Sequence, residues 1–119
     1  MLKKMKLQAI SLACAIAVCS LQPAFAQTGS GNGLITSFSA GWSSDTFTVT
    51  NSSPIINPAG CAATGEYIAT STAPGYNTYY AAVLTAYSTG SNVAFIISNT
   101  TCTQGFPTII GVNVTPSSN

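Results

Sequence analysis

The residues best suited to contact a ligand stand together in one predicted turn. This turn contains the only tryptophan of the chain, two hydroxyls and a carboxylate, supplied by Trp42, Ser43, Ser44 and Asp45. Sugars offer hydroxyls that such polar groups can hydrogen-bond, and apolar ring faces that an indole can cover. The turn therefore predicts a saccharide contact, and the alternative is that Trp42 only covers one end of the fold.

A second candidate contact is a polar segment just before Cys102. Asn99 and Thr100, followed by a further threonine, stand in a predicted loop and offer an amide and hydroxyls to a ligand. The tyrosines at positions 76, 79, 80 and 87 are less suited to this role, because their spacing is that of a packed helix face. We expect those tyrosines to serve the core and subunit contacts.

Catalysis is opposed by the charged residues of the chain. All three lysines lie within the first six positions, no arginine or histidine is present, and the remaining charged residues are Asp45 and Glu66. A histidine base, a Schiff-base lysine and an arginine clamp are therefore missing after residue 6. The two acids could act as a glycosidase pair only if they faced each other across a cleft. We expect no enzyme, and phosphate-rich partners such as nucleic acids are excluded for the same lack of cations.

The N-terminus has the pattern of a cleavable export signal. Three lysines precede an apolar run over residues 7–21, and alanines at 24 and 26 stand at −3 and −1 of a predicted cleavage before Gln27. A retained membrane anchor is the alternative, but the run is shorter than the roughly 20 residues that a bilayer requires. A lipoprotein signal is also considered, at Cys14 or Cys19, although neither has the required preceding residues. We expect a secreted or periplasmic protein without a membrane span in its mature form.

Two cysteines remain after cleavage, Cys61 and Cys102. An even number of cysteines in an exported chain predicts a disulfide, and the loop that it closes gives about 4 kcal/mol of stabilisation in the chain-entropy model. A metal-binding or reactive pair would need a CxxC spacing or accompanying histidines, and neither is present. No metal or cofactor is expected.

One helix is predicted over residues 76–90. Its apolar and aromatic residues recur at helical spacing, namely Tyr76, Tyr79, Tyr80, Val83, Leu84 and Tyr87. Asn77 is the predicted cap of the first turn, and Gly90 the residue that ends the helix. The opposite face carries no charge, which predicts a covering subunit or, alternatively, a plain surface of small residues.

The rest of the chain reads as strands in one domain. Alternating or β-branched runs separated by turn residues predict strands over 34–39, 45–51, 66–71, 93–98 and 108–114. In the second of these, Phe47 and Val49 share one face, and in the last, Ile110, Val112 and Val114 do. Residues 27–33 read as a flexible leader, 34–115 as the domain, and 116–119 as a tail.

The predicted fold is mainly β. A β-β-β-α-β-β order matches a five-stranded OB-fold-like barrel with one α-helix between strands 3 and 4. A small α+β sheet of another topology and a β-sandwich are the alternatives, because periodicity does not fix strand pairing.

Residues 78–93 and 109–112, together with the first strand at 34–38, resemble the helix and strands of the B subunits of subtilase-cytotoxin-type bacterial toxins. The resemblance implies an OB-fold, a ring of five subunits with the helices along its axis, recognition of cell-surface glycans, and a catalytic toxin subunit as partner. The segment between Ser98 and Pro107 is shorter than in those subunits and lacks tyrosine. Their sugar-binding residues do not match this chain one by one, so the resemblance supplies no site residues.

Two functions are thus predicted. The first is a secreted, non-catalytic module that binds cell-surface glycans, as the binding subunit of a bacterial toxin does. The second is an exported envelope or extracellular protein that makes structural or protein-interaction contacts without binding glycans.

Overall fold

A computed structural model describes residues 26–41 and 44–117. The predicted signal peptide lies outside these residues, except for Ala26, and so do the last two residues of the predicted tail. In chain order, the elements are β1 (Gln27–Gly29), β2 (Gly33–Ala40), β3 (Thr46–Asn51), β4 (Tyr67–Thr70), α1 (Tyr76–Thr89), β5 (Asn92–Thr103) and β6 (Phe106–Thr115). The mainly β class is confirmed, as is one helix within residues 26–41 and 44–117.

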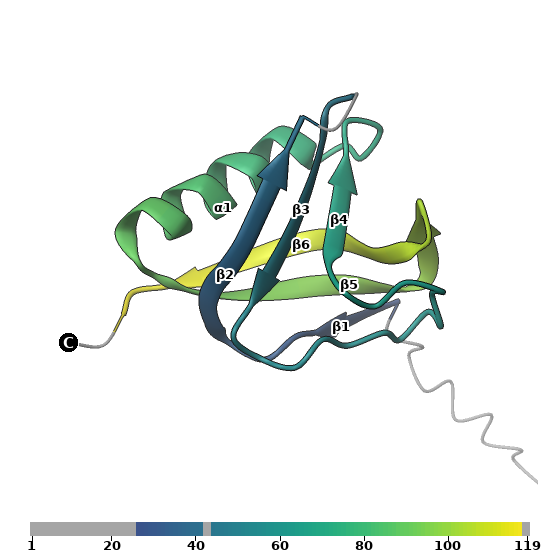
Figure 1. Cartoon of the computed structure of the whole chain (residues 1–119), viewed down its shortest axis with the longest axis horizontal. Coiled ribbons are helices and arrows are strands. Elements are labelled where there is room, and N and C mark those ends of the chain that lie inside the picture. Colours follow the sequence, from purple (N-terminus) through teal and green to yellow (C-terminus); the bar gives the residue numbers. More distant parts are fainter. Residues whose placement is uncertain (1–25, 42–43, 118–119) are drawn as a thin grey trace, which may run out of the picture.

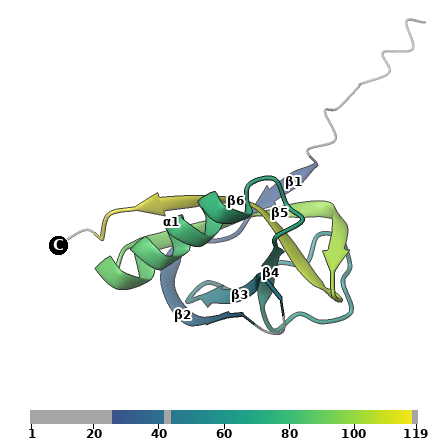
Figure 2. The same cartoon turned by 90° about the horizontal axis from the view of Figure 1, so that it is seen from above.

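The strand pairings run in a ring. Antiparallel pairs join β2 to β3 and β3 to β4, a short parallel pair joins β4 to β6, and antiparallel pairs join β6 to β5 and β5 back to β2. Figures 1 and 2 show β2, β3 and β4 as one layer that crosses the β5–β6 pair, with α1 along one side between the two layers. The part of the chain that the structure describes has six strands where the sequence predicts five, because β1 adds to the free edge of β5.

The extra strand replaces part of the predicted leader. Gln27, Thr28 and Gly29 pair with Ser98, Ile97 and Ile96 of β5, so these three residues are not a flexible leader. Composition misled the prediction here, because all three residues are exposed and backbone pairing forms the strand. The amide of Asn99 also donates to the carbonyl of Ala26 at 3.0 Å.

The core forms where the inward faces of the two layers meet. Phe47 and Val49 of β3 are fully buried, as their alternation predicts. The other members of this core come from β4, α1, β5 and β6, namely Tyr67, Ala69, Val83, Ala86, Val93, Phe95, Ile97 and Ile109.

The helix ends where the sequence predicts but begins differently. Gly90 adopts the left-handed conformation with φ of 66°, and its amide donates to the carbonyl of Ala86. Gly75 occupies the N-cap without a side-chain hydrogen bond. Asn77 lies within the first turn instead, so the predicted Asn77 cap is wrong.

The buried stripe of α1 is rotated from the predicted one. Val83 and Ala86 are buried, whereas Leu84 and Tyr87 are 43% and 56% exposed. The small side chain of Ala86 allows the helix backbone to approach the strands closely. The predicted stripe holds for the first turns, where Tyr76, Tyr79 and Tyr80 pack against the core.

A β-bulge interrupts β6 at Ile110. Ile96 pairs with Gly111 and Ile97 with Ile109, so Ile110 is an extra residue. The bulge reverses the alternation, leaving Ile109 buried and Ile110 37% exposed. Ile110 therefore does not share the predicted face with Val112 and Val114, which still share one, opposite the buried residues Phe95 and Val93. The hydroxyl of Tyr79 donates to the carbonyl of Ile110 at 2.7 Å and joins the helix to the bulge.

The disulfide between Cys61 and Cys102 is confirmed, with 5.6 Å between the two Cα atoms. Cys102 lies within β5 rather than in a loop, because β5 continues to Thr103. The bond anchors the long β3–β4 connection, and Ala63 adds a hydrogen bond to the carbonyl of Gly105 at 2.9 Å. Such a bond is typical of an oxidising, non-cytoplasmic compartment. Within the described ranges, no helix is long and apolar enough to span a bilayer.

Buried Tyr67 predicts a loss of stability in alkali. Its hydroxyl accepts a hydrogen bond from the Ile56 amide at 2.9 Å. Burial raises the pKa of Tyr67, and the Ile56 hydrogen bond offsets this only partly. The protonated hydroxyl is favoured in the folded protein. Its contribution is therefore complete below the ordinary tyrosine pKa of about 10 and is lost as the pH rises through the raised value.

We expect the free energy of unfolding to fall as the pH is raised above about 10. Urea denaturation at a series of pH values measures it. The free energy of unfolding of the Tyr67→Phe variant should fall less steeply with pH over the same range. Part of the pH dependence should remain, because burial and Asp45 also raise the pKa of Tyr76. An equal slope in wild type and variant would refute the role of Tyr67.

Candidate functional site

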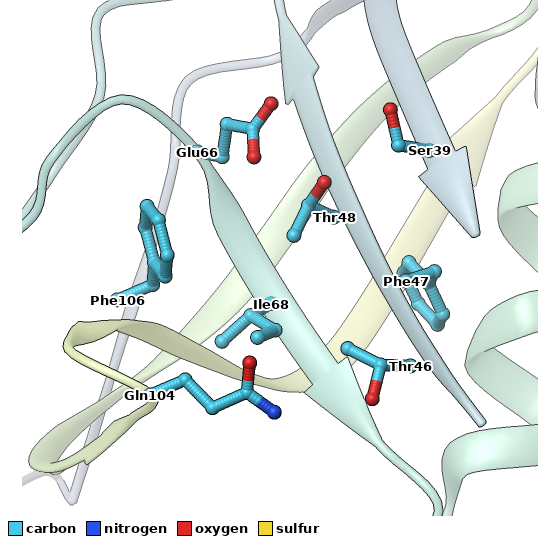
Figure 3. Close-up of a pocket in the computed structure, with 8 residues that line it drawn as sticks. All are labelled: Ser39, Thr46, Phe47, Thr48, Glu66, Ile68, Gln104 and Phe106. Carbon is cyan, nitrogen blue, oxygen red and sulfur yellow. The ribbon is translucent and has the colours of Figure 1, made fainter. Parts of the chain in front are cut away.

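A depression of about 280 Å³ lies on the outer face of β3 and β4, and we call it the β3–β4 depression (Figure 3). Because successive side chains of a strand point to opposite faces, the residues between the core positions of β3 and β4 point outward. The lining residues are Ser39, Thr46, Phe47, Thr48, Glu66, Ile68, Gln104 and Phe106.

One side of this depression is a row of oxygen atoms from β2, from β3 and from the residue that precedes β4. Thr48 pairs with Ser39 of β2 on one side and with Ile68 of β4 on the other. Glu66 precedes Ile68 by two residues and therefore shares its face. Figure 3 shows Glu66 and Ser39 on either side of Thr48, so a carboxylate and two hydroxyls line the same edge.

The floor and the opposite side are apolar, with one amide. Ile68 is 1% exposed although it points away from the core that contains its neighbours Tyr67 and Ala69. The ring of Phe106 flanks it, and the side-chain amide of Gln104 reaches toward Thr46 (Figure 3). A ligand in the depression would meet polar groups at its rim and an apolar surface beneath.

Gln104 has an unusual backbone conformation. It has φ of 50° and is followed by Gly105 with φ of 83°, in the two-residue turn between β5 and β6. Turns with two positive φ values favour Asn-Gly or Asp-Gly, and a longer side chain at the first position is disfavoured. Strained residues of this kind cluster at functional sites. Gln104 also lines the β3–β4 depression.

A second depression, of about 460 Å³, lies at the start of α1. Its lining residues are Ala40, Gly41, Asp45, Tyr76, Asn77 and Tyr80. The rings of Tyr76 and Tyr80 pack on Phe47, with centroid distances of 5.7 and 5.9 Å. Burial, and then the nearby Asp45 carboxylate, raise the pKa of Tyr76. The second depression thus pairs one acidic group with two aromatic rings.

The two carboxylates of the described chain lie at opposite ends of the β3–β4 pair. Thr46 pairs with Thr70, and Ser71 donates its amide to the Asp45 carbonyl at 2.8 Å, so Asp45 is level with Ser71. Glu66 precedes Ser71 by five residues, which corresponds to about 16 Å along a strand. The backbones of Asp45 and Glu66 are therefore separated by about this distance. Glycosidase carboxyl pairs are about 5 to 9.5 Å apart, so this geometry opposes such a pair.

No family model, curated protein or solved structure matches the chain. The similarity to toxin B subunits is therefore a prediction from the sequence alone. The function has to be argued from the side chains that line the two depressions.

Of the first predicted contact, residues 42–45, only Asp45 lines the second depression. Trp42 and Ser43 lie outside the described residues. Ser44 shares a hydrogen bond of 2.9 Å with the hydroxyl of Thr46, and Asp45 lines the second depression.

The second predicted contact has a structural role. Asn99 and Thr100 lie within β5, not in a loop, where the pairing with β6 is interrupted between Ile97 and Cys102. The side-chain oxygen of Asn99 accepts a hydrogen bond from the Thr28 hydroxyl at 2.6 Å and so ties β1 to β5. Thr100 is exposed, and its amide donates to the Ser98 hydroxyl at 3.2 Å. Neither residue lines either depression.

Sequence reasoning considered Glu66 only as one half of a glycosidase pair, and it did not single out Gln104 or Phe106. The outward threonines of β3 were visible in the alternation of residues 46–50, but their neighbours depend on strand register. The Gln-Gly pair before Phe106 was the available signal, because it is a two-residue turn between alternating runs.

Proposed function

We propose that the chain is an exported, non-catalytic binding module that recognises saccharides of glycoconjugates through the β3–β4 depression. The carrying observation is the composition of that depression: a carboxylate, an amide and hydroxyls surround an apolar floor and an aromatic ring. Hydroxyl, amide and carboxylate groups match the hydrogen-bonding capacity of sugar hydroxyls, and apolar side chains match the C–H faces of the ring.

The finer fold description is part of the same proposal. The ring of pairings, with the parallel β4–β6 pair and a helix between β4 and β5, supports an OB-type barrel made of β2 to β6. OB-type barrels bind oligosaccharides among other ligands on their outer face and loops. We also propose an export signal over residues 1–26, from the sequence pattern. The resemblance to toxin B subunits adds two further proposals, a ring of five subunits and a catalytic toxin subunit as partner.

Gln104→Asn tests the proposal. Asparagine tolerates positive φ better than glutamine, and its side chain is one carbon shorter. We expect the free energy of unfolding to stay equal or rise, while saccharide binding by the mature chain weakens severalfold. A glycan array finds the ligand, and isothermal titration calorimetry with that ligand compares the variants.

Gln27→Asn is the matched control, because it makes the same change on an exposed residue of β1. It should bind as the wild type does. A blank array with wild-type protein, or equal binding by Gln104→Asn, would overturn the proposal.

The second function, a protein-interaction module without glycan binding, is favoured by one observation. Leu84 and Tyr87 are exposed on α1, the helix whose outer face carries no charged residue. A blank array together with retention of a protein partner through this face would support it.

A further inference from the structure

The exported chain has negative side chains and no positive ones. The three lysines of the full sequence all lie at or before residue 6, within the proposed export signal, and no lysine, arginine or histidine follows. Asp45 and Glu66 are the remaining charged side chains, and each lines one of the two depressions. An acidic ligand would therefore meet a like charge at either depression and no side-chain cation that could neutralise it.

Glu66 occupies the β3–β4 depression under conditions that strengthen its field. Ile68 and Phe106 form the apolar surface beside it, and Thr48 lies between it and Ser39 (Figure 3). Charges interact more strongly next to apolar groups than in open water. The electrostatic interaction of a charged group on a bound saccharide with Glu66 would therefore be stronger than its interaction with a fully exposed carboxylate at the same distance.

We infer that Glu66 makes the β3–β4 depression selective for amine-bearing and neutral saccharides over acidic ones. The ammonium of an unacetylated hexosamine would be attracted by the carboxylate, whereas a sialic or uronic acid would be repelled. This inference rests on the proposed function and names the ligand class of the same site.

Matched saccharide pairs test the inference, because their members have the same sugar backbone and differ at the position that carries the charge. Suitable pairs are glucosamine oligomers with their N-acetylated forms, and galactose oligomers with the corresponding galacturonic acid oligomers. The measurement is the ratio of the two dissociation constants within each pair that binds, by titration calorimetry at neutral pH and low salt. We expect the amine-bearing or neutral member to bind about tenfold more tightly, and the ratio to shrink as salt is added.

Glu66→Gln should bring these ratios close to one while the neutral saccharides still bind. Asp45→Asn is the matched control, because it removes the same charge about 16 Å away. That distance exceeds the Debye length of about 8 Å at physiological ionic strength, so this variant should keep most of the selectivity when it is measured in such salt. Thermal unfolding of both variants checks that they remain folded.

The outcomes separate the inference from the proposed function. If no saccharide of any charge binds the wild type, the proposed function fails and the inference fails with it. If saccharides bind but acidic members bind as tightly as neutral ones, or if Glu66→Gln keeps the wild-type ratios, only the inference is overturned. A ratio that depends on Asp45 instead would also overturn it and would move the site to the second depression.

Discussion

Replacing both disulfide cysteines, as Cys61→Ser with Cys102→Ser, should lower the free energy of unfolding by about 4 kcal/mol. The bond joins residues 41 positions apart, and its loss frees this loop in the unfolded chain. The bond also anchors a long β3–β4 connection that contains no helix or strand of its own. Urea denaturation of the purified mature chain measures the change. Changing both cysteines together avoids the reactive thiol that a single replacement would leave.

Wild-type protein treated with a reductant is the control for this prediction. It should match the double variant, because both lack the bond while only one has altered side chains. A decrease below about 1 kcal/mol would show that the hydrogen bonds of the connection, such as those between Asn57 and Cys61, hold it without the disulfide.

The same bond connects the two sides of the β3–β4 depression. Glu66 follows Cys61 by five residues, and Gln104 follows Cys102 by two. The amide of Ala63 donates to the carbonyl of Gly105 and joins the same two segments a second time. A loosened connection would therefore move the carboxylate relative to the amide. The bond that stabilises the domain also fixes the geometry of the proposed site.

Local patterns predicted the features that depend on local physics. The alternation of β3 placed Phe47 and Val49 in the core, and Gly90 marked the end of α1, because both depend on neighbours in the chain. The pair of cysteines in a chain with an export pattern predicted the disulfide. Each of these inferences required no knowledge of which strand pairs with which.

The errors arise where pairing decides the outcome. β1 forms because the edge of β5 offers hydrogen bonds, although its own residues favour no strand. The bulge at Ile110 changes which side of β6 is buried, and only the neighbouring Gly111 is a local sign of it. The site depends on register in the same way. Glu66 and Gln104 line the same depression because β4 pairs with β6 and because a short turn joins β5 to β6. Single-sequence patterns therefore put the threonines of β3 on the face opposite Phe47 and Val49, but they predicted no ligand contact there.

Phe47→Ala should cost about 3 to 5 kcal/mol of unfolding free energy. Phe47 is fully buried at the junction of the strand layers and α1. Its ring lies 5.7 to 5.9 Å, between centroids, from the rings of Phe38, Tyr76 and Tyr80. Alanine would leave a cavity that these large rings cannot easily close. Since small domains are stable by about 5 to 15 kcal/mol, the variant would lose a large share of its stability.

Phe47→Leu provides the control, because leucine keeps much of the buried volume and loses only the ring contacts. It should unfold at a urea concentration between those of the wild type and Phe47→Ala. If Phe47→Leu were as unstable as Phe47→Ala, the aromatic contacts rather than the filled volume would hold α1 against the strands. If Phe47→Ala cost less than about 1 kcal/mol, Phe47 would not be central to the core.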